Sequence, residues 1–369
     1  MKVMLAIFKL DKLGGKERDC IAIARHLAAR GHDVTVLTTS ADVPGIDDLK
    51  LVTLRARGLA NHALLRDFAR GVIERKLRAE PDALLSFERI PDADFHYAAD
   101  GAAILREWRL WSWPPRRRTR LALERAVFAS PAATRLFFMT ERQRDEYIIA
   151  YDFEPSRATV LPMILHDDRY AAARKLGAGD SRKDRGRKDL GVAADELLAV
   201  SVAVDPKLKG VDRSLAALTL YPKLHLVIAG SDAPWLHRRV VRLDLESRVH
   251  IVPYVAEVMD LIATADFMLH PARSEAAGQV IGEALLAGVP VLASAACGYA
   301  DEIARSGAGM VLPDPFQQDA LINGIAHMID ALPAMRKAAA VRARSLQQQR
   351  GAWLSVIAER IERGAAKPR

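Results

Sequence analysis

The sequence has few of the residues that build disulfide frameworks or metal centres. Its two cysteines, Cys20 and Cys297, lie far apart and form no CxxC pair, which excludes a disulfide scaffold and indicates a reducing, cytosolic compartment. No histidine, cysteine or carboxylate cluster has metal-ligand spacing, and no DxD-type motif stands in a convincing place. We therefore expect metal-independent chemistry without a bound cofactor.

Long hydrophobic runs and leader segments are also missing. The longest uncharged run, Ala284–Ala300, falls short of the ~20 residues that a membrane helix needs. Gly288 and Pro290 interrupt its middle, so it predicts a helix, a turn, a buried strand and a turn. Met1–Ala6 reads directly as an apolar strand, and no solenoid repeat is found, so we expect neither a transmembrane helix nor a secretion signal.

What the sequence does contain is the composition of a globular protein with a sizeable core. Hydrophobic residues make up 50% of the chain and charged residues 27%. At 369 residues, two domains are the first expectation. The net charge of +8 permits a nucleic acid, an anionic membrane or a phosphorylated substrate as partner and does not choose among them.

Short apolar strands alternate with helical patterns in two separate blocks, which is typical of doubly wound parallel sheets buried on both faces. Gly31 ends the first predicted helix, which runs from Lys16 to Arg30. The sequence therefore predicts two Rossmann-like α/β domains. The predicted strands are Lys2–Ile7 and Val34–Leu37 in the first block, and Leu197–Val204, Leu224–Ala229, Val249–Val252, Phe267–His270 and Pro290–Ala293 in the second.

The boundary between the two blocks is predicted near the hinge segment Leu161–Pro162. We expect an N-terminal domain at 1–163, a C-terminal domain at 164–345, and a final helix at about 346–369 that packs back on the first domain. The charged, glycine-containing segment Arg174–Lys188 reads as a flexible surface insertion.

The stretch from Glu275 to Pro290 carries the most specific chemical signal. It follows a predicted strand, and a helix that begins near Ala276 would direct its N–H groups and positive dipole end to the carboxyl edge of the sheet, where a diphosphate fits. Small residues at Ala276, Ala277 and Gly278 allow close approach. Glu275 would stand at the mouth of this site and Glu283 two turns into the helix, although an isolated pair of glutamates is more often a pair of helix-surface charges.

Candidate site residues also follow strands of the first block. Gly14 and Gly15 occupy the first strand-to-helix loop, where a simple turn is an equal alternative to a ligand-binding loop. Asp19 lies in the first turn of the helix and has a structural explanation there as well. Asp100 ends the stretch Phe95–Ala99 and points to the crevice where parallel sheets bind ligands, with a helix cap as the alternative.

The segment HPARSEAAGQVIGEALLAGVPVLASAACGY, from His270 to Tyr299, resembles the donor-site signature of the retaining glycosyltransferases of family 4, which have the GT-B fold. The resemblance extends over nearly the whole chain and is strongest to members that build the lipopolysaccharide core. The segments that carry it are Gly14–Asp19, Ala60–His62, Tyr97–Asp100, Leu123–Ala126, Lys209–Ser214 and Cys297–Ala300.

The resemblance implies a role for each matching residue of the donor site. Glu283 would bind the ribose, and Glu275 would hold hydroxyls of the transferred sugar, helped by the backbone of 276–278. Lys209 would bind the diphosphate and stabilise the charge that grows on it as it leaves. An arginine precedes the matching lysine in the resembled members, whereas this chain has Leu208 there and Lys207 one step earlier.

Contacts outside that stretch are implied in the same way. Gly230, Asp232 and Val255 match loops that hold the nucleotide base. Asp100 would lie beside the transferred sugar, and the Gly14–Gly15 loop, with Asp19, would face the diphosphate and the acceptor. The GT-B fold implies two parallel sheets that face each other across a cleft. The alternatives are another sugar or acceptor on the same fold, a UDP-sugar epimerase, or a binding module without catalysis.

Tryptophans and arginines are concentrated between Ile104 and Arg125. This segment holds three of the five tryptophans and seven arginines, a combination that favours an anionic membrane surface. A core helix with a solvated basic loop and a nucleic-acid strip are the alternatives, and we expect no nucleic acid.

The resemblance implies transfer of a hexose, glucose from UDP-glucose, to a heptose of the lipid A inner core, with retention of the anomeric configuration. The expected partners are therefore a UDP-sugar, heptosylated lipid A and the cytoplasmic face of the inner membrane, with the enzyme acting as a peripheral monomer.

Overall fold

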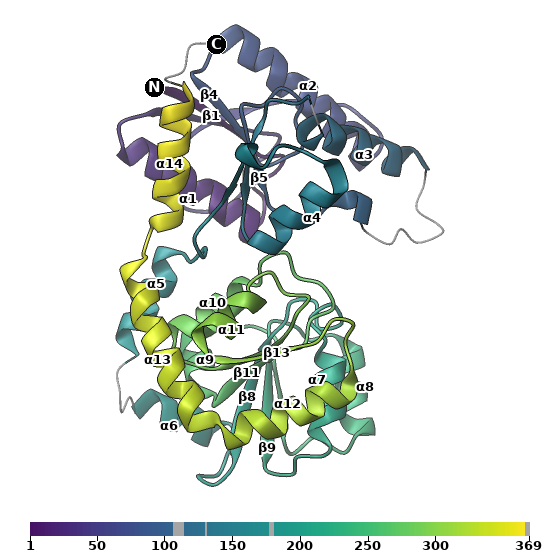
Figure 1. Cartoon of the computed structure of the whole chain (residues 1–369), viewed down its shortest axis with the longest axis vertical. Coiled ribbons are helices and arrows are strands. Elements are labelled where there is room, and N and C mark those ends of the chain that lie inside the picture. Colours follow the sequence, from purple (N-terminus) through teal and green to yellow (C-terminus); the bar gives the residue numbers. More distant parts are fainter. Residues whose placement is uncertain (106–113, 130, 177–180, 366–369) are drawn as a thin grey trace. The chain divides into compact units, whose positions relative to one another are not determined.

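The computed structural model describes residues 1–105, 114–129, 131–176 and 181–365. The chain divides into two compact units, an N-terminal unit of Met1–Met163 with Ala352–Arg369 and a C-terminal unit of Ile164–Gly351. The division at Met163 is the one that the sequence predicted, whereas the C-terminal unit runs to Gly351 rather than to residue 345. Each unit is an α/β layer structure, as Figure 1 shows.

The N-terminal unit is built on a parallel sheet in the order β3-β2-β1-β4-β5-β6-β7. Its strands are β1 (Lys2–Ala6), β2 (Asp33–Thr38), β3 (Lys50–Thr53), β4 (Ala83–Ser86), β5 (Phe95–Ala98), β6 (Arg135–Phe138) and β7 (Ala158–Val160). Its helices are α1 (Gly15–Ala29), α2 (Asn61–Ala79), α3 (Pro114–Phe128), α4 (Glu141–Tyr151) and α14 (Ala352–Ala365), with the short 3₁₀ turns η1 (Ala103–Leu105) and η2 (Pro155–Arg157).

The C-terminal unit repeats this plan with the strand order β10-β9-β8-β11-β12-β13. Its strands are β8 (Leu197–Val202), β9 (Leu224–Ala229), β10 (Val249–Val252), β11 (Phe267–His270), β12 (Val291–Ser294) and β13 (Gly309–Leu312). Its helices are α5 (Asp167–Lys175), α6 (Ser181–Asp189), α7 (Val211–Leu218), α8 (Pro234–Arg242), α9 (Val258–Thr264), α10 (Gln279–Leu286), α11 (Ala300–Ser306), α12 (Gln318–Asp330) and α13 (Leu332–Gln348).

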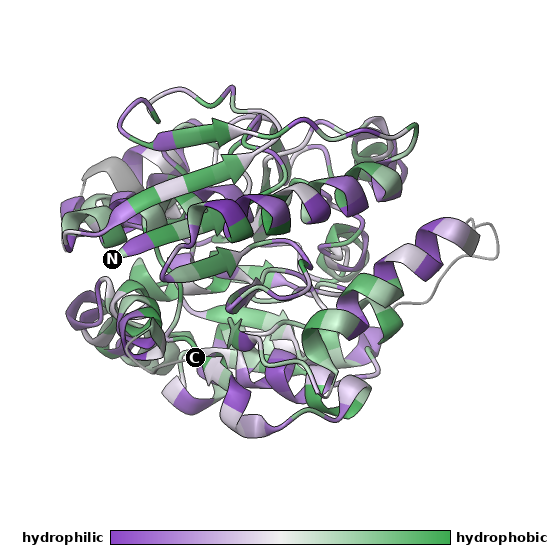
Figure 2. Cartoon of the chain, turned by 90° about the horizontal axis from the view of Figure 1, so that it is seen from above, coloured by the Kyte–Doolittle hydropathy of each residue, from purple (hydrophilic) through white to green (hydrophobic). Residues whose placement is uncertain are grey.

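The predicted fold class is confirmed, because both sheets are parallel throughout the described residues and are covered by helices. Strands such as β4, β9 and β12 are buried at every position, which explains their continuous apolar sequences. Figure 2 shows the strands hydrophobic over most of their length and the helices alternating between hydrophobic and hydrophilic faces. No helix of the described residues has the length and apolar character of a membrane span.

The prediction of a flexible insertion at Arg174–Lys188 is wrong for its described part. Ser181–Asp189 forms α6, which packs on α9 so closely that a Cβ at Gly186 would lie 2.6 Å from Thr264 Cγ2. Arg187 also donates to Asp266 Oδ2 at 2.9 Å. The polar composition hid a helix whose stability comes from these contacts with distant residues, which local sequence does not reveal.

The last helix belongs to the N-terminal unit, where α14 packs against α1 (Figure 1). Glu362 of α14 accepts hydrogen bonds from Arg30 Nε at 2.9 Å and Nη2 at 2.8 Å, and it lies 2.9 Å from His32 Nε2. Trp353 and Ile361 are buried on the same helix. The helix therefore completes the N-terminal core although it comes last in the chain.

The ion pair at Glu362 provides a test of this docking. Glu362→Gln should lower the free energy of unfolding of the N-terminal unit by about 0.5–1 kcal/mol at pH 7, because the pair is partly exposed and screened by solvent. Hydrogen bonds from Arg30 and then His32 lower the pKa of Glu362 to about 2 from 4.5, so the stabilisation is present above pH 4.5 and is lost as the pH falls toward 2.

Urea unfolding of both proteins at pH 7 and at low pH measures this difference. Glu359→Gln is the control, because Glu359 accepts a hydrogen bond from Arg363 of its own helix and attracts Arg30 less strongly than Glu362 does, so it should change stability little. An equal loss in the two variants would contradict the docking role of Glu362.

Candidate functional site

Each sheet has one point at which the strand order reverses, and parallel sheets bind ligands at the carboxyl ends of the strands beside that point. In the N-terminal unit the reversal lies between β1 and β4, and in the C-terminal unit it lies between β8 and β11. The loops that follow β8 and β11 carry the charged candidates Lys207, Lys209 and Glu275. The fold therefore gathers, in each unit, residues that are far apart in the sequence.

An ion pair bridges the reversal point of the C-terminal unit. The ammonium of Lys209, after β8, contacts the carboxylate of Glu275, after β11. The two side chains are only 20% and 18% exposed. Burial lowers the pKa of Lys209, outweighing the effect of the nearby Cys297 and Asp205. The structure thus brings together the two residues that the sequence assigned to the diphosphate and the sugar.

A close backbone approach sets the position of Lys209. Gly210 has a φ of +72°, and a Cβ at this position would overlap the carbonyl oxygen of Pro271. Arg273 ties the same two loops, because its N–H donates to Leu208 O at 2.8 Å and its guanidinium donates to both oxygens of Asp212 at 2.8 Å. Only glycine combines this conformation with this contact.

The backbone of Glu275 is held by hydrogen bonds to the loop that follows β12. Its N–H donates to Ala296 O at 3.2 Å, and its carbonyl accepts from Gly298 N at 3.1 Å, which extends the sheet by one bridge to Cys297. Gly278, with a φ of +86°, caps α10. The helix therefore begins at Gln279 and not near Ala276 as predicted, because the left-handed turn at Gly278 separates it from a short loop of Ala276–Gly278.

Glu283 lies on α10 and is 14% exposed. Its Oε1 accepts a hydrogen bond from Arg169 Nε of α5 at 2.6 Å. Sequence reasoning missed Arg169, because nothing in its local sequence distinguishes it. Arg169 and Glu283 are 114 residues apart in the chain, and only the fold brings them into contact. A ribose at Glu283 would therefore meet a carboxylate that Arg169 already orients.

The loops predicted to hold the base lie at the carboxyl ends of β9 and β10. Gly230 has a φ of +97° and donates to Val252 O at 3.0 Å. Asp232 accepts from His237 Nε2 at 2.6 Å, and Val255 is half-buried. Lys207 places its ammonium 5.4 Å from the centroid of the Trp235 ring. The described contacts of Lys207 thus differ from those of Lys209.

A second lysine–glutamate pair bridges the reversal point of the N-terminal unit. Lys16 Nζ of α1 donates to Glu88 Oε1, after β4, at 2.6 Å. Burial lowers the pKa of Lys16, but the carboxylates of Glu88, Asp100 and Glu17 together raise it above its usual value. Gly14 caps α1 with a φ of −83°, and Gly15 is the first helical residue. The two glycines therefore lie at the start of α1, next to Lys16, and Gly14 does not need a conformation special to glycine.

Asp100 lies after β5, and its side chain is half exposed, facing a cavity of about 420 Å³ that Lys16, Glu88, Arg89 and Arg116 also line. Its Oδ2 lies 3.8 Å from Arg89 Nη1. Arg89 is charged, because the carboxylates and Tyr147 around it raise its pKa against the effect of burial. The cavity is therefore suited to polar, hydroxyl-rich groups.

A buried network holds the backbone beneath Asp100. The carbonyl of Asp100 accepts from Tyr147 Oη at 3.1 Å and from Gln143 Nε2 at 3.0 Å. Glu124, fully buried, accepts from Ala103 N at 2.8 Å and lies 3.6 Å from Arg89 Nη2. Asp100 is thus positioned as a loop residue after its strand.

Asp19 is 2% exposed and accepts a hydrogen bond from Tyr97 Oη at 2.7 Å. This contact ties α1 to β5 inside the N-terminal core, and it supports a structural role for Asp19. A contact of Asp19 with an acceptor stays a prediction. Among the described residues no group of three histidine, cysteine or carboxylate side chains is placed to hold a metal ion, and metal-independent catalysis also stays a prediction.

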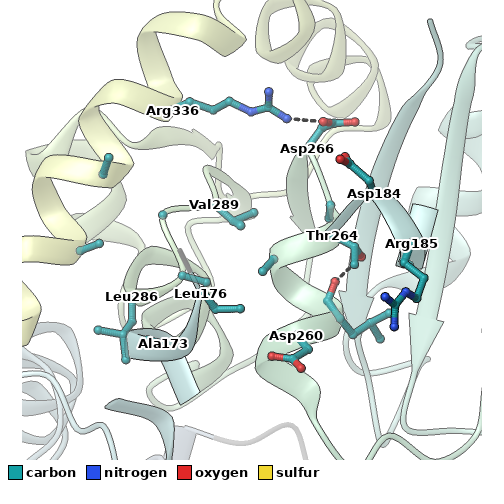
Figure 3. A pocket seen from close by; sticks show the side chains of 18 of the residues that line it. Ala173, Leu176, Asp184, Arg185, Asp260, Thr264, Asp266, Leu286, Val289 and Arg336 are labelled. Carbon is teal, nitrogen blue, oxygen red and sulfur yellow. Dashed lines mark hydrogen bonds and ion pairs between the residues drawn. The ribbon is translucent and has the colours of Figure 1, made fainter. Parts of the chain in front are cut away.

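A larger cavity of about 870 Å³ lies at the opposite edge of the C-terminal sheet, and Figure 3 shows its lining. Asp266, at the amino end of β11, accepts there from Arg336 and from Leu198 N. These contacts join α13 and β8 to the start of β11. Cavity size therefore does not locate the candidate site, since the carboxyl ends of the strands lie at the other edge.

Two units, each built on a parallel sheet that is covered by helices, are the architecture of the two-domain transferases with the GT-B fold. The family model of glycosyl transferases group 1 matches residues 182–345. The lipopolysaccharide glucosyltransferase WaaG of Escherichia coli (strain K12) is 33% identical over 335 residues, which cover 87% of each chain.

Solved structures are similar over the whole length. The crystal structure of WaaG, a glycosyltransferase involved in lipopolysaccharide biosynthesis, has a TM-score of 0.82 at 31% identity and covers 97% of this chain and 99% of its own. Anabaena Alr3699/HepE in complex with UDP and glucose has a TM-score of 0.73 at 19% identity, with 98% of each chain covered, and shows the shared fold alone. The chain belongs to the group 1 glycosyltransferases.

The close approach of Gly210 to the carbonyl oxygen of Pro271 can be tested by substituting alanine for Gly210. Gly210→Ala should destabilise the C-terminal unit by about 2–4 kcal/mol and weaken nucleotide binding, because a left-handed alanine is strained and its Cβ pushes the Pro271 loop away from Lys209. Thermal unfolding and titration with UDP measure the two effects.

Gly191→Ala is the matched control. Gly191 has a φ of +68° in the same unit, but an added Cβ there meets nothing within 4 Å. It should cost only the backbone strain, about 1–2 kcal/mol, and leave nucleotide binding unchanged. Equal effects of the two variants would contradict the importance of the contact between Gly210 and Pro271.

Proposed function

We propose that this glycosyltransferase transfers a hexose, glucose from UDP-glucose, to a heptose of the lipid A inner core, with retention of the anomeric configuration. The observation that carries this proposal is the Lys209–Glu275 pair at the reversal point of the C-terminal sheet. The relative in Escherichia coli, which is named a lipopolysaccharide glucosyltransferase, supports the acceptor class and the sugar. Another nucleotide sugar or another lipid-linked or glycan acceptor is the alternative.

In the donor complex, the diphosphate binds Lys209 and the N-terminal end of α10, where free N–H groups and the helix dipole favour an anion. Glu275 accepts hydrogen bonds from hydroxyls of the sugar, with the backbone of Ala276–Gly278 beside it. Glu283 binds the ribose, and the loops at Gly230 and Val255 hold the base. The negative charge that develops on the leaving diphosphate is stabilised by the Lys209 ammonium.

The acceptor binds to the N-terminal unit, in which the Gly14–Gly15 loop and Asp19 are the proposed contacts, and Asp100 lies beside the transferred sugar. Retention follows from attack on the same face that the diphosphate leaves, and a diphosphate oxygen takes the proton of the acceptor hydroxyl. No side chain needs to become a covalent nucleophile, and no metal is needed if Lys209 and the helix dipole supply the positive charge.

A donor screen against purified heptosylated lipid A, in buffer with EDTA and with product mass as the readout, tests this proposal. The expected product gains one hexose from UDP-glucose. A product formed only from another nucleotide sugar would show the donor to be wrong, whereas transfer only to other glycans would show the acceptor to be wrong.

The role of Lys209 is separable from that of its neighbour. Lys209→Ala should lower kcat by about 10²–10³-fold, since it removes the charge that stabilises the leaving group. Lys207→Ala is the control, because its ammonium faces the Trp235 ring and should matter much less. Initial rates of UDP release measure both variants, and similar losses would contradict the assignment.

We also propose that the segment Ile104–Arg125 contacts the anionic surface of the inner membrane from the cytoplasmic side. Its three tryptophans belong to 106–113, which lies outside the described residues. The described part begins α3 and exposes Arg116 and Arg118. Arginines near an anionic surface contribute about 1 kcal/mol each, and a lipid-linked acceptor would be reached from there.

Vesicle sedimentation tests this contact. Replacing Arg116 and Arg118 by glutamine should weaken binding to anionic vesicles by about tenfold or more and leave binding to neutral vesicles unchanged. Replacing the exposed Arg238 and Arg242 of α8 removes the same charge elsewhere and should have little effect. Equal losses would indicate attraction by net charge alone.

A further inference from the structure

His270, the last residue of β11, is completely buried, with 0% of its surface exposed. Neither of its ring nitrogens has a hydrogen-bond partner among the described residues. A buried polar group without a partner destabilises the fold and calls for an explanation, because any apolar residue would fill the same position at lower cost. The proposed chemistry uses Lys209 and Glu275 but has assigned nothing to this imidazole.

One charged neighbour of His270 is Glu275, the glutamate of the proposed donor site. His270 Nε2 lies 3.6 Å from Glu275 Oε2, just beyond hydrogen-bond range. In this conformation the same Oε2 is engaged by the ammonium of Lys209. The imidazole of His270 therefore lies next to the Glu275 carboxylate, which is paired here with Lys209, the residue proposed to bind the diphosphate.

We propose that His270 is a positioning residue, whose Nε2–H donates a hydrogen bond to the Glu275 carboxylate when the diphosphate of the donor draws the Lys209 ammonium away. This inference rests on the donor roles proposed for Lys209 and Glu275. The carboxylate then keeps one fixed partner below it and offers its remaining lone pairs to hydroxyls of the sugar.

The imidazole is suited to this task because it stays neutral. Burial, and then the charge of Lys209, lower the pKa of His270 to about 3, so it carries no charge at neutral pH. A neutral N–H orients a carboxylate without attracting the diphosphate, whereas a second cation would compete for it. Neutral histidine keeps one donor, and the proposed tautomer places that donor on Nε2.

Only a small movement is needed to close the contact. The backbone of Glu275 is fixed by its hydrogen bonds to Ala296 and Gly298, so a rotation of its side chain brings Oε2 from 3.6 Å to hydrogen-bond distance. The strand end holds His270, because β11 pairs with β8 and β12 on its two sides. The movable partner is therefore the carboxylate.

The test compares variants that keep or remove a hydrogen-bond donor at position 270. His270→Leu should lower kcat/KM for the UDP-sugar by about tenfold to a hundredfold, the range of a hydrogen bond to a charged group. Affinity for UDP, which lacks the sugar, should change by less than about threefold, because water solvates Glu275 when no sugar covers it. His270→Gln supplies an amide donor and should recover part of the rate.

Two controls separate positioning from packing. His225→Leu replaces another buried histidine of the same sheet, at the start of β9, and should leave kcat/KM unchanged. In a Glu275→Gln background, His270→Leu should cost less than about twofold more, because a residue that acts through Glu275 has nothing left to position. If the losses of His270→Leu and Glu275→Gln simply multiplied in the double variant, the inference would be overturned. It would also be overturned if His270→Leu lowered the affinity for UDP as much as it lowers kcat/KM.

The wild-type protein gives a readout that does not depend on the folding of variants. In ¹⁵N-edited NMR spectra of the imidazoles, the Nε2–H resonance of His270 should move to the position of a hydrogen-bonded proton when the UDP-sugar is added. An unchanged resonance in a protein that turns over the donor would overturn the positioning role alone. A protein that neither binds nor turns over any UDP-sugar would refute the proposed donor site itself, and this inference with it.

Discussion

The ion pair between Lys209 and Glu275 is the interaction on which the rest of the site depends. It joins the loops that follow β8 and β11, the two strands beside the reversal point of the C-terminal sheet. Next to Lys209, Gly210 lets the backbone of the first loop approach Pro271 of the second, where a Cβ would overlap the carbonyl oxygen. A half-buried pair of this kind is weak support for stability, since burial costs both charges much of their hydration. The pair instead holds the Lys209 and Glu275 side chains in a defined position at the carboxyl edge of the sheet.

Both units have a lysine–glutamate ion pair at the point where the strand order reverses. Lys16 and Glu88 bridge the reversal point of the N-terminal sheet, as Lys209 and Glu275 do in the C-terminal unit. In both, the lysine comes from the loop or helix start after the first strand of the unit, and the glutamate follows the strand that pairs on its other side. The doubly wound topology brings these positions together, so the likeness of the two pairs follows from the fold and needs no likeness of sequence.

Much of this arrangement could be predicted, and the failures have physical causes. Continuous apolar segments predicted β8, β9 and β11 closely. The segment around α6 was missed because its polar residues hide a helix that depends on contacts with α9 and Asp266. The start of α10 was placed three residues early because no local pattern reveals the left-handed turn at Gly278. Arg169 escaped notice because only the fold carries it to Glu283.

The sequence by itself determined the fold class and the division near residue 163 and singled out Glu275 and Glu283 as candidates, because strand periodicity and the Glu275–Glu283 stretch are local patterns. Tertiary structure alone decided which partners those carboxylates have. The pairing of Glu275 with Lys209, the burial of His270 beneath it and the orientation of Glu283 by Arg169 all join residues distant in the chain. Hydrogen bonds and ion pairs depend on tenths of an ångström, and only a folded backbone sets such distances.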